Sequence, residues 1–72
     1  MQKEIDWLAR AEYYGKEAAA NGRRHMSADD REDIALAYGV SRWLDIPFYE
    51  RDAAMECFRR GWDIEKRNQR GF

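Results

Sequence analysis

The sequence predicts a small all-α domain in which two longer helices pack through glycine and alanine faces, with a shorter helix and a turn between them. Three observations lead to this prediction. The only proline, Pro47, leaves a long uninterrupted stretch on each side. Glycine and alanine recur at helical spacing in both outer stretches, and capping residues bound the segment between them. Because 72 residues can bury only one core, we expect a single helical domain over residues 1–72.

The first helix is expected from about Gln2 to Asn21, a stretch without proline and rich in good helix formers. Gly15 lies inside it and costs about 1 kcal/mol of helix propensity, so we expect it to have a packing role. Gly22 should end the helix in the left-handed conformation. The predicted inner stripe and its neighbours are Leu8, Ala11, Gly15, Ala18 and Gly22, with Trp7, Tyr14 and Ala19 beside them.

A second, shorter helix is expected from Ala28 to Tyr38. Ser27 precedes it and Asp30 follows three residues later, which is the spacing of a capping box with Asp in place of Glu. Gly39 should end it. The residues predicted to face inward are Ile34, Ala35, Ala37 and Tyr38.

The segment Ile34–Ser41, IALAYGVS, has the small residue, glycine and apolar residue of a helix-turn-helix. A recognition helix would have to start near Ser41, but Pro47 follows after six residues and disfavours helical geometry at Ile46. A DNA-binding regulator is therefore the weakest of the alternatives. Over 40–46 we expect a turn with a short helical piece, which buries Val40, Trp43, Leu44 and Ile46.

The third helix should begin at Pro47, which suits a first helical turn, and run to about Asn68. Its predicted inner stripe comprises Phe48, Arg51, Met55, Phe58 and Trp62, with Ala54 and Gly61 alongside. Gly61 next to a tryptophan indicates close contact with another helix. We therefore expect the outer helices to cross where Gly15 and Ala18 face Gly61 and Ala54.

Composition narrows the class of protein. The formal net charge is −1, which does not indicate an indiscriminate polyanion binder, but segment 27–46 is acidic and both ends are slightly basic. One cysteine, Cys57, precludes an internal disulfide and favours a reducing cytoplasm. No apolar run approaches the roughly 18 residues of a membrane span, and no signal-peptide core is present, so we expect a soluble cytoplasmic protein without a membrane partner.

The sequence offers little catalytic chemistry. His25 follows two arginines, which would repel a metal ion, and Cys57 has no second ligand at metal spacing, so we expect a solvated histidine and a packed thiol. The carboxylates Asp29, Asp30, Glu32 and Asp33 lack the spacing of a calcium loop and are interpreted as a solvated helix start. We therefore predict a non-enzymatic protein with no catalytic residues, metal, cofactor or small-molecule substrate.

Two segments resemble the ribosome modulation factor family. GKEAAANGR, from Gly15 to Arg23, is similar to its pattern of a glycine, an alanine three residues later and a second glycine followed by arginine. PFYERDAAMECFRRGW, from Pro47 to Trp62, is similar to its proline-aromatic start and its Gly-Trp finish. The connection between these segments is much longer here than in the family. The resemblance implies a small helical fold in which these faces touch.

In that family the bacterial protein binds ribosomal RNA near the messenger-binding channel and silences ribosomes in stationary phase. The resemblance thus implies a small protein that modulates the ribosome, with phosphate contacts from Arg23, Arg24, Arg59, Arg60, Lys66 and Arg67. Tyr13 and Tyr49 are expected to stay exposed. They would stack on RNA bases or, as such residues more often do, anchor a protein partner such as a second copy of the chain.

The main alternative is an inhibitor or accessory protein encoded by a phage or plasmid, which binds a host protein through aromatic and acidic surfaces. Short sequences related to the family are widespread in phages and mobile elements. Salt should separate the two functions, because RNA binding weakens steeply as salt rises and an aromatic protein interface weakens little.

Overall fold

The computed structural model describes residues 6–70, and the fold within them is all-α, as predicted. Its elements are α1 (Trp7–Ala20), α2 (Ala28–Tyr38), the short 3₁₀ helix η1 (Trp43–Asp45) and α3 (Phe48–Arg70). No strand occurs among residues 6–70. The part of the first predicted helix that falls on residues 2–5 lies outside the described residues.

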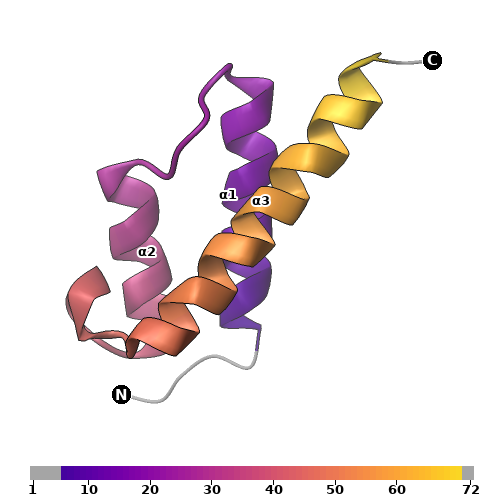
Figure 1. The fold of residues 1–72 in the computed structure, drawn as a ribbon. Coiled ribbons are helices and arrows are strands. Elements are labelled where there is room, and N and C mark those ends of the chain that lie inside the picture. The colour runs from indigo at the N-terminus through magenta and orange to yellow at the C-terminus, as the bar shows by residue number, and fades with distance from the viewer. Residues whose placement is uncertain (1–5, 71–72) are drawn as a thin grey trace.

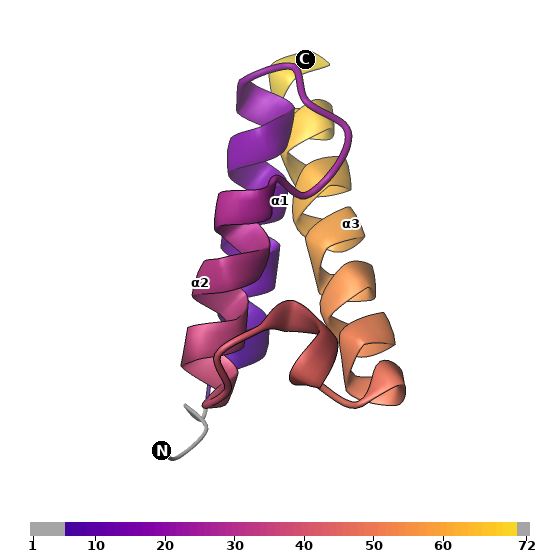
Figure 2. The ribbon, with the colours of Figure 1, turned by 90° about the vertical axis from the view of Figure 1, so that its left-hand side faces the viewer.

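Helix α1 packs against both of the other helices, and α2 and α3 lie on neighbouring sides of it (Figures 1 and 2). The chain ascends through α1, descends through α2 and ascends again through α3, so α1 and α3 run in the same direction. The contact between α1 and α3 is by far the most extensive in the molecule, whereas α2 packs mainly on α1 and η1. The linker 21–27 thus lies at the same end as the second half of α3.

The α1–α3 contact forms at glycines, as predicted. A Cβ atom added to Gly15 would overlap the backbone carbonyl of Phe58, and one added to Gly61 would overlap the carbonyl of Glu12. Both glycines are buried. The side chains of Ala18 and Ala54 are fully buried as well, so small residues on each helix allow the two backbones to approach.

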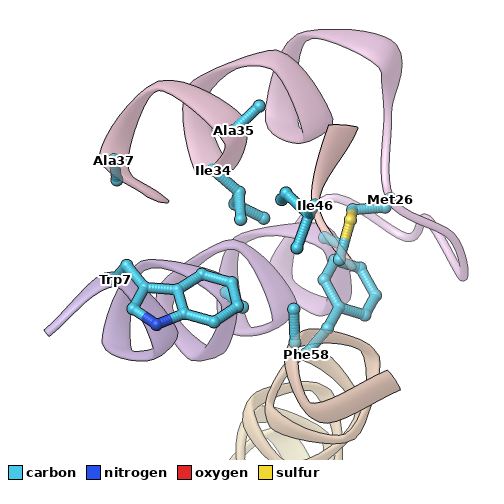
Figure 3. Packing of buried hydrophobic residues seen from close by; sticks show 10 residues of the cluster. Trp7, Met26, Ile34, Ala35, Ala37, Ile46 and Phe58 are labelled. Carbon is cyan, nitrogen blue, oxygen red and sulfur yellow. The ribbon is translucent and has the colours of Figure 1, made fainter. Parts of the chain in front are cut away.

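The apolar core is built where the three helices and the connecting segments meet (Figure 3). Ile34 of α2 and Ile46, which precedes α3, are its largest fully buried side chains. Trp7, the first residue of α1, covers one end of the core, and its ring centroid lies 4.7 Å from that of Tyr38 in an edge-on arrangement. The residues of α2 predicted to face inward do so: Ile34, Ala35 and Ala37 are buried, and Tyr38 is half-buried against the core.

Helix α2 begins and ends at the residues that the sequence indicates. The Ser27 hydroxyl accepts a hydrogen bond from the Asp30 amide at 3.1 Å, and the Asp30 carboxylate accepts one from the Ser27 amide at 3.2 Å. This is the reciprocal capping box. Gly39 ends the helix at φ 108°, a left-handed conformation that disfavours other residues. Beyond it, η1 is only three residues long and Ile46 is extended, so a recognition helix is absent from residues 40–46.

Several side chains predicted to be buried are exposed, and those predictions were wrong. Phe48 is 69% exposed, Leu44 of η1 is 74% exposed and Met55 is 43% exposed. The reason is that α2 packs on α1, so the face of α3 that carries Phe48 and Met55 has no helix over it. Gly22 is also exposed; as predicted, it turns the chain after α1 with φ 76°.

Two carboxylates of the acidic segment belong to the fold, which corrects the prediction of a solvated cluster. Asp30 is 6% exposed and takes part in the capping box. Asp33 accepts hydrogen bonds from the Tyr14 hydroxyl at 2.5 Å and from the Arg10 guanidinium at 3.1 Å. Both of these hydrogen bonds join α2 to α1, and the charge of the carboxylate strengthens them. Asp29 and Glu32 are exposed, as expected.

The raised pKa values of two tyrosines predict how the stability of the fold changes with pH in the alkaline range. The hydrogen bond to Asp33 raises the pKa of Tyr14 to about 12, and the hydrogen bond to Glu50 raises the pKa of Tyr38 to about 12. A folded-state pKa above the unfolded value of 10 means that folding favours the neutral phenol. This stabilisation is complete below pH 10 and is lost as the pH rises through 12. Thermal unfolding followed over this range should show Tm falling steadily.

The variant Asp33→Asn tests the assignment of the first tyrosine. It removes the charged acceptor, so the Tyr14 hydroxyl should ionise closer to its ordinary pKa of about 10, as measured by the ultraviolet absorbance of phenolate. Subtracting the titration of Tyr14→Phe from that of the unaltered protein isolates the Tyr14 transition. A difference curve centred near an ordinary phenol pKa of about 10 in the unaltered protein would contradict the interpretation.

Candidate nucleic-acid interface

The six basic residues singled out in the sequence lie at one end of the molecule. The linker 21–27 contributes two arginines, and residues 59–69 of α3 contribute three arginines and a lysine, compared with two carboxylates. We call these two segments the basic end. Helix α2 has the opposite balance, with four carboxylates and one arginine. The near-zero net charge of the chain therefore conceals a strong separation of charge.

A groove of about 380 Å³ lies at the basic end, between the linker and α3. We call it the linker groove. Its apolar residues are Met26 from the linker and Met55, Phe58 and Trp62 from α3. Its polar residues are Arg24, His25, Arg59 and Asp63. An apolar surface is thus bordered by two arginines, a histidine and one carboxylate.

Two contacts hold the linker over α3. The Trp62 indole Nε1 donates a hydrogen bond to the carbonyl oxygen of Arg23 at 2.7 Å. The Met26 side chain is 5% exposed and extends from the linker toward the Phe58 ring (Figure 3). Both walls of the linker groove are therefore fixed before any partner binds.

Arg23 belongs to this framework and is not a free cation. Its guanidinium donates a hydrogen bond to the Asp30 carboxylate at 3.3 Å, which ties the linker to the start of α2. Because Asp30 is buried, the pair is better shielded from solvent than a surface ion pair. Of the two linker arginines, only Arg24 is exposed and has no ion-pair partner among the described residues.

The basic residues of α3 differ in their neighbours. Arg59 and Arg67 are exposed and form no ion pair within residues 6–70, whereas Arg60 lies 3.9 Å from the Glu12 carboxylate. Arg59, Arg60 and Arg67 line a second hollow on α3, together with Glu56 and Asp63. Lys66 places its ammonium 5.3 Å from the centroid of the Trp62 ring, close enough for a cation–π contact.

The C-terminal part of α3 is anchored to the end of α1. The side-chain amide nitrogen of Gln69, Nε2, donates a hydrogen bond to the carbonyl oxygen of Ala19 at 3.2 Å. The Lys66 ammonium in turn donates to the Gln69 side-chain oxygen at 3.5 Å. The basic residues of α3 are thus presented on a helix that is held at both the glycine crossing and its far end.

Tyr13 and Tyr49 are exposed as predicted, but neither lies at the linker groove. The Tyr13 hydroxyl donates to the Glu17 carboxylate at 2.7 Å, and this hydrogen bond raises the pKa of Tyr13. Tyr49 lies at the start of α3 with its ring centroid 5.8 Å from that of Phe48. The aromatic residues that do join the basic end are Phe58 and Trp62.

Sequence reasoning missed Trp62, Met55 and Met26 as candidate site residues because it assigned the two α3 residues to the core. A signal was present: Met55, Arg59 and Trp62 are spaced by four and three residues and share one helical face. The contribution of Met26 has no local signal, because it depends on how the linker folds back over α3.

The remaining reactive groups are dispersed. Cys57 is a free thiol, half-buried against the core, and burial raises its pKa. His25 is exposed at the linker groove. Within residues 6–70, no group of three or more His, Cys, Asp or Glu side chains is arranged to hold a metal ion. In the same range, no helix combines the length and apolar character needed to cross a bilayer.

Comparison with models of protein families, with curated proteins and with solved structures finds no match to this chain.

Proposed function

We propose that this protein is a non-enzymatic binding protein that modulates the ribosome by contacting ribosomal RNA with its basic end. The observation that carries the proposal is the gathering of Arg24, Arg59 and Arg67, from two distant parts of the chain, on one end of a molecule whose net charge is −1. Such a local concentration of positive charge attracts phosphates even when the whole chain is nearly neutral.

The excess of negative charge on α2, compared with the positive charge of the basic end, supports a defined orientation of the protein on RNA. Its exposed carboxylates, Asp29 and Glu32, would be repelled by phosphates, whereas the basic end would be attracted. The resemblance of Gly15–Arg23 and Pro47–Trp62 to the ribosome modulation factor family names the ribosome as the partner. The α1–α3 contact at Gly15 and Gly61 is consistent with that resemblance.

The test is cosedimentation with purified bacterial ribosomes at about 50 mM and about 200 mM salt, followed by fluorescence anisotropy on ribosomal RNA fragments. The unaltered protein should sediment with ribosomes at low salt and detach at high salt. In Arg24→Gln/Arg59→Gln, the plot of log affinity against log salt should become shallower by about 0.7 for each arginine that no longer neutralises a phosphate.

The matched control is Arg31→Gln/Arg42→Gln, which makes the same change in net charge at exposed arginines outside the basic end. This variant should keep the affinity and the salt slope of the unaltered protein. Equally weakened binding in both double variants would show a nonspecific charge effect and would contradict the proposal. So would the absence of the unaltered protein from the ribosomal fraction at low salt.

A different observation favours a second candidate function, inhibition of a host protein. Leu44, Phe48 and Tyr49 are 74%, 69% and 63% exposed and lie within one short stretch at the end opposite the linker. Exposed large apolar side chains in a group are typical of protein interfaces. If this stretch binds a protein, Phe48→Ser should abolish capture of that partner, and salt should affect the capture little.

A further inference from the structure

We propose that the linker groove receives one unpaired nucleobase, so that the protein binds single-stranded RNA in preference to duplex RNA. This inference rests on the proposed function and adds the class of RNA and the place where it is recognised. The observation behind it is the combination of an apolar surface with a cationic border in the linker groove.

The apolar surface requires an occupant with an apolar face. Phosphates alone would be satisfied by exposed arginines and would gain nothing from Met55, which is 43% exposed, or from the half-buried ring of Trp62. A nucleobase has a broad, polarisable face, and bases pack readily on aromatic and thioether side chains. In an intact duplex that face is covered by the neighbouring base pairs, so only an unpaired base can supply it without unstacking.

The cationic side chains at the border of the groove favour an occupant that carries negative charge next to its apolar part. Arg24 and Arg59 come from its two walls, the linker and α3, and His25 adds a ring N–H donor. A nucleotide in a single strand carries a phosphate on each side of its sugar, which matches a cation on each wall. An apolar side chain of a protein partner would bring no such pair of charges. Charge complementarity therefore favours a nucleotide over a peptide.

The size of the groove limits the occupant to one base. At about 380 Å³ it lies at the small end of the range typical of ligand sites. Its walls are already positioned by the Trp62–Arg23 hydrogen bond and by buried Met26, so little ordering is needed on binding.

Asp63 adds a preference among bases. A carboxylate accepts hydrogen bonds but donates none, so it suits a base with an exocyclic amino group. Cytosine offers the two N–H groups of its amino group, whereas uracil offers only one imide N–H, which lies between two carbonyl oxygens that a carboxylate repels. Among pyrimidines of equal size we therefore expect cytosine to bind more tightly than uracil.

Three RNAs of equal length and label test the inference by anisotropy at low salt: oligocytidine, oligouridine and a duplex. Oligocytidine should bind about tenfold more tightly than the duplex, the effect of stacking one base, and severalfold more tightly than oligouridine. In Met55→Gln, which replaces the exposed apolar side chain by a polar one of similar size and the same charge, affinity for oligocytidine should fall toward that for the duplex. Asp63→Asn should remove the preference for cytosine over uracil.

The matched control is Leu36→Gln, which makes the same apolar-to-polar change at a half-exposed position of α2 away from the groove and should leave all three affinities unchanged. Circular dichroism of each variant verifies the fold. If oligocytidine and duplex bind equally, or if Met55→Gln changes nothing, the groove does not hold a base, although the proposed function stands. If no RNA binds at low salt, both proposals are wrong.

Discussion

Gly15→Ala is expected to destabilise the protein by about 2 kcal/mol or more, although alanine is the better helix former. Helix propensity alone would favour the variant by about 1 kcal/mol. The added Cβ, however, would overlap the Phe58 carbonyl, which is backbone and cannot rotate away as a side chain would. Relieving the overlap requires α1 and α3 to separate, and overpacking of this kind costs about 1–3 kcal/mol and occasionally more.

A destabilisation of this size is large for so small a domain. Proteins are stable by about 0.05–0.15 kcal/mol per residue, which corresponds to about 4–11 kcal/mol for this chain. Tm should therefore fall by roughly 10–20 °C in a thermal unfolding experiment. Gly61→Ala should behave similarly, because its Cβ would overlap the Glu12 carbonyl on the other side of the same crossing.

The control for this prediction is Ala9→Gly, at an exposed position of α1. There only helix propensity changes, so the variant should be less stable by about 1 kcal/mol. If Gly15→Ala were as stable as the unaltered protein, or more stable, the two helix backbones would not be in close contact.

Ile34→Ala should cost about 2–5 kcal/mol, the range observed when a large buried aliphatic side chain is truncated. Ile34 is fully buried and lies where α2 meets the rest of the core. The cavity left behind is bounded by elements held in place by other contacts, including the Tyr14–Asp33 hydrogen bond, so it cannot collapse freely. Chemical denaturation gives the free energy of unfolding directly.

Leu36→Ala provides a comparison on the same helix. Leu36 is two residues away and 50% exposed, so its truncation should change the free energy of unfolding by no more than about 0.5 kcal/mol. Similar destabilisation in the two variants would mean that α2 is not docked through its Ile34 face.

The helices were predictable where their signals are local. The Ser27–Asp30 capping box and Gly39 bound α2 as the sequence indicates, because both act within a few residues of the chain. The start of α3 just after Pro47 has the same origin. The crossing at Gly15 and Gly61 was also predictable, since a glycine inside a strong helical pattern usually has a packing reason.

The rotation of α3 was not predictable in this way. Helical periodicity places Phe48, Met55, Phe58 and Trp62 on one broad apolar face, but it does not say which part of that face a neighbour covers. Because α2 packs on α1, only the side of α3 that carries Ala54, Phe58 and Gly61 is buried. The remainder, with Phe48 and Met55, stays exposed, and Met55 supplies part of one wall of the linker groove.

By itself, then, the sequence determined an all-α chain, the limits of α2, the glycine crossing and the positions of its charges. Only the tertiary structure decided what those residues can do. It pairs Arg23 with Asp30, leaves Arg24 and Arg59 available, and seats Trp62 beneath a linker 39 residues earlier in the chain. Capping and periodicity act over one or two helical turns, whereas the linker groove arises from contacts between residues far apart in sequence, which no local pattern records.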